Sequence, residues 1–257
     1  MKTGFIFLIA AIVTFCSLVP SLAGNAAGFA PLKLEGHLVK WGKTELGTPA
    51  HVTYAFVQQP IVQEKARNCG AMDSLARLAR LSSLGLEDVR RQASLAFQLW
   101  QNVSGLTFEE IADVNAADIL LGVQSIPRGF AFTNVRFQSD FADRPKSNVT
   151  DVSDRGLGKP GRQPEARSGA TAAAKLARIT RSAVCLNPVH KWKIGFDGDL
   201  KTYDLQYTFA HEIGHAIGLD HYLRKSSIMH FKYRETFEGL QPSDIEGVRW
   251  LYGARID

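Results

Sequence analysis

The sequence predicts an α+β domain, because strand-like segments come first and helical segments lie between and after them. Apolar residues alternate in the strand-like segments and recur at helical spacing in the others. The expected strands are residues 51–57, 106–111, 119–123 and 179–186, and the expected helices are residues 86–103, 203–218 and 242–252, with a short helix near residues 75–81.

The first elements carry clear local signals. Val52, Tyr54 and Phe56 fall on one face of the first strand, as in a half-buried strand. Residues 86–103 instead place apolar side chains along one helical face, and Gly105 follows as a stop signal. The sequence therefore predicts a strand followed by a long helix.

The second half of the chain begins with an irregular stretch. Residues 125–174 are rich in glycine and proline and show no period, so we expect a long loop that is functional or mobile. Helical spacing returns in residues 203–218 with one apolar stripe. Pro242 and Gly253 then bracket the closing helix, residues 242–252.

The first 23 residues resemble a secretory signal peptide. Lys2 precedes an apolar run that Pro20 ends, and Ser21 and Ala23 offer small residues for cleavage. An uncleaved membrane anchor is the alternative, but the run is short for a bilayer about 30 Å thick. We expect an exported protein, extracellular or periplasmic, with no stable membrane insertion after cleavage.

The chain of 257 residues has a formal net charge of +5, and much of the excess lies in residues 155–181. No nucleic-acid module accompanies these basic residues, so we predict no nucleic-acid partner. A solvated basic loop is the simpler interpretation. A basic rim that favours acidic substrates is the alternative.

Two cysteines remain once Cys16 leaves with the signal peptide. In an exported protein, an even pair such as Cys69 and Cys185 favours a disulfide.

The most informative segment is residues 211–221. Four residues on a helix advance about 400°, so His211 and His215 project from one face and can bind the same zinc ion. His221 can join them only if the helix breaks first, and Gly218 stands where that break is needed. Three neutral histidines leave one position open, which is typical of a catalytic zinc.

Glu212 lies beside the first ligand and is expected to act in catalysis. Zinc lowers the pKa of a water molecule, Glu212 accepts its proton, and the resulting hydroxide attacks the scissile carbonyl. Glu212 then returns the proton to the leaving amine. The alternative is that these histidines are ordinary core or surface residues of a helix. The combination of five fixed positions, His211, Glu212, His215, Gly218 and His221, argues against it.

Residues 211–221 resemble the metzincin zinc peptidases, and among them the matrixins. Met229 follows His221 by eight residues, where metzincins carry a methionine in a tight turn beneath the zinc. Astacins are the rival subfamily, but Tyr222 replaces their glutamate after the third histidine. Phe231 replaces their tyrosine after the methionine.

The resemblance covers about two-thirds of the mature chain, from Trp41 to Gly253. It implies a mixed, five-stranded twisted sheet above a cleft with an active-site helix below. It also implies a catalytic domain in residues 24–257, with an upper subdomain to about residue 218 and a small lower one in residues 219–257. Tyr233 falls where matrixins wall the S1′ pocket.

Some matrixin features are missing. Their structural zinc needs a His-x-Asp segment, which does not occur, so we predict one catalytic zinc and no structural zinc. Calcium sites are conceivable at acidic residues of the irregular stretch, namely Asp140, Asp143, Asp151 and Asp154. Matrixins also hold themselves latent with a cysteine on the zinc. The segment around Cys69 partly resembles that switch, but it lies inside the domain.

The sequence therefore predicts a secreted, monomeric zinc-dependent endopeptidase that cleaves proteins or peptides. A non-catalytic zinc-binding or adhesion protein is one alternative, and the presence of Glu212 argues against it. A peptidase that processes one specific partner is another, because residues 125–174 could restrict access to the cleft.

Overall fold

The computed structural model describes residues 28–64, 66, 68–139, 149–153, 175–224, 226–236 and 239–256, and of residues 149–153 it describes the backbone alone. The expected signal peptide, residues 1–23, lies outside this part of the chain. No helix in the described part is long and apolar enough to cross a membrane.

Four helices and twelve strands make up the described fold. The helices are α1 (Ala76–Ser82), α2 (Leu86–Gln101), α3 (Leu205–Ala216) and α4 (Pro242–Tyr252). The strands are β1 (Lys33–Leu34), β2 (His37–Lys40), β3 (Ala50–Phe56), β4 (Ile61–Val62), β5 (Ala71–Asp73), β6 (Leu106–Glu110), β7 (Ile119–Gln124), β8 (Ala131–Gln138), β9 (Val149–Ser153), β10 (Lys175–Leu186), β11 (Trp192–Lys193) and β12 (Tyr203–Asp204).

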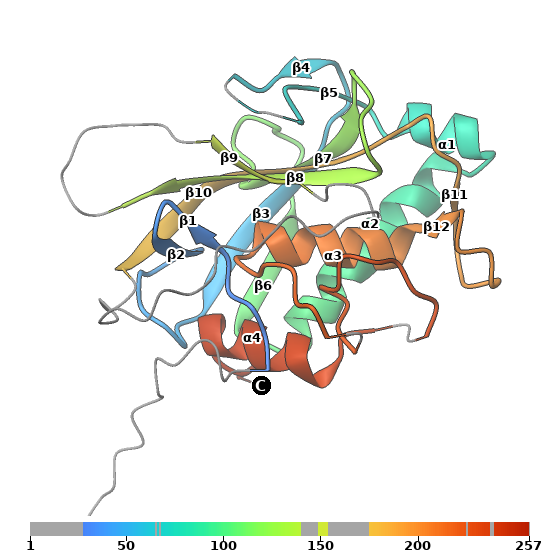
Figure 1. The fold of residues 1–257 in the computed structure, drawn as a ribbon. Coiled ribbons are helices and arrows are strands. Elements are labelled where there is room, and N and C mark those ends of the chain that lie inside the picture. Colours follow the sequence, from blue (N-terminus) through green and yellow to red (C-terminus); the bar gives the residue numbers. More distant parts are fainter. Residues whose placement is uncertain are drawn as a thin grey trace, which may run out of the picture.

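One mixed sheet covers the helices (Figure 1). Strands β6, β3, β7 and β10 run parallel in that order, and β8 pairs antiparallel with β10. Strands β3, β6, β7 and β10 were expected by residue range, and with β8 they make up the five-stranded sheet that the resemblance implied. The sheet is nevertheless larger than expected, because short strands extend it: β1 and β2 beside β10, β4 and β5 beside β7, and β9 beside β8.

The prediction of a structureless loop over residues 125–174 was wrong in part. This stretch contains β8 and β9, which pair with each other from Phe132↔Ser153 to Arg136↔Val149. Alternation is absent from β8 because its first five residues are all buried, including Thr133 and Asn134. A strand covered on both faces shows no two-residue period.

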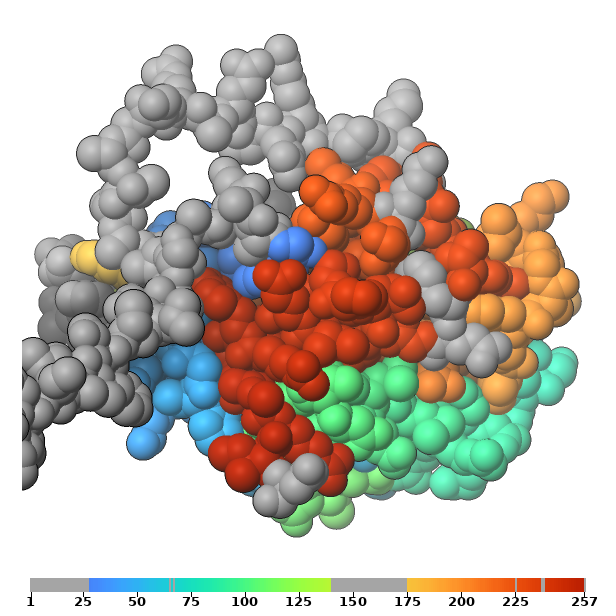
Figure 2. Space-filling view, turned by 90° about the horizontal axis from the view of Figure 1, so that it is seen from below, coloured from blue at the N-terminus to red at the C-terminus, as the bar shows by residue number. Residues whose placement is uncertain are grey.

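Helices α2 and α3 pack together beneath the sheet (Figure 1). Trp100 of α2 is fully buried, and its indole Nε1 donates to the carbonyl oxygen of Ala210 in α3 at 3.0 Å. Seen from below, α4 borders the segment that follows α2 (Figure 2). There Arg249 Nε donates to Val103 O at 2.7 Å, so α4 closes the lower side of the core.

The end of α3 is fixed by a glycine and its close neighbour. Gly218 has a φ of +100°, a backbone conformation that residues with side chains rarely adopt. A Cβ at this position would collide with the carbonyl oxygen of Val39 in β2. Both the conformation and the approach of β2 therefore require glycine here.

Three successive carbonyl groups at this helix end, those of residues 216–218, are hydrogen-bonded by distant parts of the chain. The donors are Trp41 Nε1 to Ala216 O at 2.9 Å, Tyr252 Oη to Ile217 O at 2.7 Å, and Leu32 N to Gly218 O at 2.8 Å. Asp220 N also donates to Ala30 O at 2.8 Å. Because buried carbonyls need partners, these bonds stabilise the exit from α3.

A disulfide joins Cys69 to Cys185 of β10, with the Cα atoms 6.0 Å apart. Both residues are fully buried. The bridge spans 116 residues of sequence and ties the segment between β4 and β5 to the centre of the sheet.

We predict that Gly218→Ala destabilises the fold by at least about 2 kcal/mol, because strain at positive φ adds to the collision with Val39. Gly36 provides a matched control, since its φ is +82° but a Cβ there meets nothing within 4 Å. Gly36→Ala should cost only about 1 kcal/mol. Urea unfolding measures both. Equal losses in the two variants would contradict the role of the close approach.

We also predict that the double variant Cys69→Ser/Cys185→Ser loses about 2–5 kcal/mol of unfolding free energy, because a long loop in the unfolded chain is released. Urea unfolding of the wild type with and without reductant measures the same effect. An unfolding midpoint that does not respond to reductant would count against the bridge.

Candidate active site

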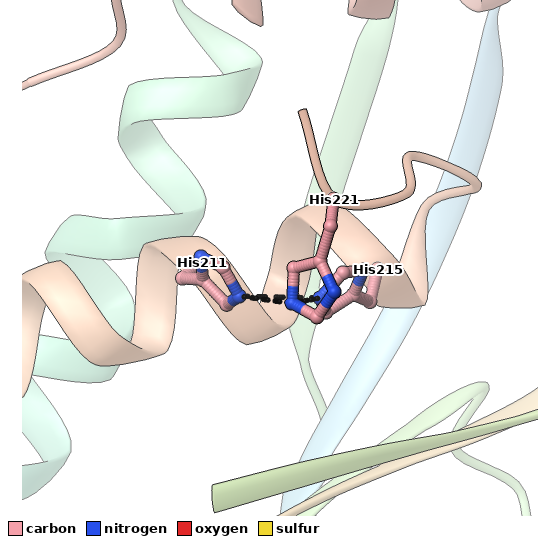
Figure 3. Close-up of side chains that lie close together, drawn as sticks. All are labelled: His211, His215 and His221. Atoms are coloured by element: carbon pink, nitrogen blue, oxygen red, sulfur yellow. Dashed lines mark hydrogen bonds between the residues drawn. The ribbon is translucent and has the colours of Figure 1, made fainter. Parts of the chain in front are cut away.

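Three histidines converge at the end of α3 (Figure 3). His211 and His215 come from adjacent turns of the helix, and His221 returns from the segment after Gly218. Their Nε2 atoms form a nearly equilateral triangle, with 3.2 Å between His211 and His215, 3.2 Å between His215 and His221, and 3.3 Å between His211 and His221. The helix end described above thus brings all three imidazoles to one point.

The opposite ring nitrogens determine which tautomer is present. His211 Nδ1 lies 2.6 Å from Ile228 O, and His215 Nδ1 lies 2.8 Å from Leu219 O. A ring nitrogen that faces a carbonyl oxygen must carry the hydrogen, so both Nε2 atoms present lone pairs to the centre of the triangle. Lone pairs this close repel one another unless a cation lies between them.

Burial favours the neutral form of these rings. His215 is fully buried and His211 nearly so. Burial, followed by the neighbouring His221 and His211, lowers the pKa of His215 well below its ordinary value. A neutral imidazole is the form that binds a metal ion.

The donor set fits zinc. Tetrahedral zinc with nitrogen ligands at about 2.0–2.1 Å places those nitrogens about 3.3 Å from each other. The observed separations of 3.2–3.3 Å match this value. Three protein ligands leave a fourth position, which is the ligand count of catalytic rather than structural zinc sites.

Glu212 lies next to His211 on α3 and is almost completely buried, with 1% of its surface exposed. The hydroxyl of Thr133 in β8 lies 2.6 Å from Glu212 Oε2 and 3.0 Å from the carbonyl oxygen of the same residue. The strand above the helix therefore orients the carboxylate. Sequence reasoning missed Thr133, because it lies in the stretch expected to be a loop.

Met229 lies in a turn packed beneath α3. A Cβ on Gly214 would collide with its sulfur, so the turn and the helix are in close contact. Asp244 of α4 holds the turn, accepting from Ser227 Oγ at 2.5 Å and from Ile228 N at 3.0 Å. Ile228 is also the residue whose carbonyl accepts from His211, so α4 supports the histidine through this turn.

A small pocket of about 20 Å³ adjoins the histidines and is here called the side-chain pocket. It is lined by His211, Glu212, Tyr203, Tyr207 and Tyr233, among others. The ring of Tyr233 stacks on Tyr203 with 4.4 Å between centroids and meets the edge of Tyr207 at 5.0 Å. Tyr233 therefore does line a pocket beside the histidines.

The other candidate residues are either outside the described side chains or engaged in a different interaction. Asp140, Asp143 and Asp154 lie outside the described residues, and Asp151 belongs to β9, where only the backbone is described. The sulfur of Cys69 is bonded to Cys185 and is not a thiolate that could bind zinc. Within the described ranges, the three histidines are the one cluster of potential metal ligands with three or more members.

Comparison with known proteins gives consistent results. The matrixin family model matches residues 158–253. Similar proteins include an interstitial collagenase of Sus scrofa, which is 30% identical over 171 residues, or 66% of this chain and 29% of the collagenase. The metalloendoproteinase 1-MMP of Arabidopsis thaliana is 27% identical over 215 residues, or 81% of this chain and 48% of that protein.

Matrix metalloproteinase-19 of Homo sapiens is 29% identical over 177 residues, or 68% of this chain and 28% of that protein. The chain thus spans less than half of the length of these relatives. The matched segment contains the histidine cluster, and the alignments extend beyond it. The mixed sheet and four helices of the described residues also agree with the matrixin match. The comparisons therefore support a matrix metalloproteinase-type catalytic domain in this chain.

Proposed function

We propose that this chain is a zinc-dependent endopeptidase in which His211, His215 and His221 hold the metal and Glu212 is the general base and acid. The observation that carries the proposal is the triangle of three Nε2 atoms with a buried carboxylate beside it. A site that only clamps a metal has no need of Glu212.

When bound, zinc supplies a Lewis acid that polarises the scissile carbonyl and lowers the pKa of water. The Glu212 carboxylate accepts a proton from the attacking water and later donates it to the leaving amine. Thr133 holds Glu212 Oε2 by a hydrogen bond, which limits rotation of the carboxylate. The carbonyls of Ile228 and Leu219 keep two imidazoles oriented throughout.

The substrate class we propose is a protein or peptide, with one side chain seated in the side-chain pocket. Its small volume and tyrosine walls favour small or medium side chains there. Met229 supports the floor of the site, and we assign it the role of the metzincin methionine. We further propose that residues 1–23 direct export and that the mature enzyme acts as a monomer.

A narrower function is favoured by β9. This strand pairs with Phe132–Arg136 of β8, the strand that carries Thr133. Extended peptides commonly bind by adding to an exposed strand edge. Because β9 already pairs with this part of β8, an extended substrate cannot add there while β9 stays in place. We therefore propose, as the second candidate, an enzyme that processes few partners.

We predict that Glu212→Ala retains about one zinc per chain, while kcat/KM for peptide cleavage falls by about 10²–10⁴-fold or more, since proton transfer is lost. Metal analysis and a peptide library measure the two quantities. Glu87→Ala is the control, because Glu87 is an exposed carboxylate on α2. Equal cleavage by wild type and Glu212→Ala would refute the role of Glu212.

We predict that zinc raises the melting temperature of the metal-free wild type, because a ligand that binds only the folded state stabilises it by about 2.7 kcal/mol at a hundredfold excess over Kd. His221→Ala should lose most of this response. His51→Ala should keep it, because His51 is exposed and pairs with Glu109 away from the site.

Thermal scans with and without added zinc make this measurement. A response in His221→Ala equal to that of the wild type would contradict the three-histidine site. Zinc binding by a wild type that cleaves no peptide would favour the non-catalytic alternative.

A further inference from the structure

A buried carboxylate that is not part of the catalytic group lies behind the side-chain pocket. Glu235 follows Tyr233 by two residues, and its side chain is 5% exposed. Its Oε1 accepts from Tyr233 Oη at 2.8 Å and pairs with Lys193 Nζ at 2.5 Å. Its Oε2 accepts from the backbone nitrogen of Gly198 at 2.6 Å and from that of Asp197 at 3.1 Å.

These bonds connect the wall of the pocket to a separate turn. Residues 194–199 form a turn after β11. Glu235 binds Lys193 at the end of β11 and the turn residues Asp197 and Gly198. Asp204 holds the same turn at a further point, because its Oδ2 accepts from Gly195 N at 2.7 Å. The turn is therefore fixed to both the pocket wall and the start of α3.

The hydroxyl of Tyr233 is the central link. It donates to Glu235 and accepts from the backbone nitrogen of Asp204 at 2.9 Å. Asp204 caps α3, accepting from Tyr207 N at 2.7 Å. Since α3 carries His211, the Tyr233 ring is held at a set position relative to the metal site by two hydrogen bonds.

Both charged side chains of this pair have little contact with solvent. The side chain of Lys193 is 11% exposed and that of Glu235 is 5% exposed. Without Glu235, Lys193 would keep Asp197 as a partner, whereas the Tyr233 hydroxyl would lose its acceptor. Burial alone would raise the pKa of Glu235, but hydrogen bonds from Lys193, Gly198 and Tyr233 lower it, so the carboxylate is ionised at neutral pH.

The turn also lines a second, larger space. A cavity of about 230 Å³ adjoins the side-chain pocket and is lined by Gln92, Leu99, Ile194, Phe196, Tyr207 and Ile228. Tyr207 lines both spaces. Because Tyr207 and Tyr233 pack edge to face, a shift of Tyr233 would open room for longer side chains.

We propose that Glu235, paired with Lys193, is a positioning residue that sets which substrate side chains the enzyme accepts. It acts through the Tyr233 hydroxyl and does not touch the reacting atoms. The inference rests on the proposed peptidase function. It assigns the selectivity of that site to the Lys193–Glu235 ion pair and its bond to the Tyr233 hydroxyl, here called the ionic tether.

The test uses zinc-loaded full-length enzyme and two peptides that differ only in the residue after the scissile bond, alanine or tryptophan. The measured quantity is the ratio of kcat/KM for the alanine peptide to that for the tryptophan peptide. We expect Glu235→Ala to lower this ratio about fivefold, roughly the effect of one lost hydrogen bond. Tyr233→Phe loses two hydrogen bonds and should lower the ratio at least as much. Glu235→Gln keeps an acceptor for Tyr233 and should remain closer to the wild type.

Asp197→Ala is the matched control. The Asp197 carboxylate pairs with the same Lys193 but is 62% exposed and has no bond to Tyr233. Its ratio should equal that of the wild type. The tether is refuted if Tyr233→Phe, which keeps the ring, retains the wild-type ratio, or if Asp197→Ala lowers the ratio as much as Glu235→Ala. Absence of cleavage by the wild type would instead count against the peptidase function itself.

Discussion

The end of α3 at Gly218 is the constraint on which the rest of the site depends. The helix alone aligns His211 and His215, but a continued helix would carry His221 away from them. The positive φ of Gly218 and the approach of Val39 turn the chain back at this residue. The Nε2 atom of His221 then lies 3.2–3.3 Å from the Nε2 atoms of His211 and His215.

This exit is stabilised by parts of the chain that are far from it in sequence. Leu32 and Trp41 come from the N-terminal strands and Tyr252 from the last helix, and each donates to a carbonyl at the end of α3. Asp244 of the same last helix holds the turn that contains Met229. Segments near the two ends of the described chain thus support the helix end and the turn that position the histidine cluster.

The sequence predicted the histidine cluster better than the contacts that support it. The spacing of residues 211–221 predicted the histidine cluster because helix periodicity is a local property. Thr133 and the bonds from Leu32 and Tyr252 were not predicted, since they depend on contacts between distant segments. Strand β8 was missed for a related reason, because a strand buried on both faces has no alternating pattern. The ionic tether at Glu235 likewise joins segments that carry no common motif.

X-ray absorption at the zinc edge of the purified enzyme would test the metal centre most directly. We predict three imidazole nitrogens at about 2.0–2.1 Å and one further oxygen ligand. A sulfur ligand at about 2.3 Å, or only two imidazoles, would contradict the convergence of His211, His215 and His221 on one ion.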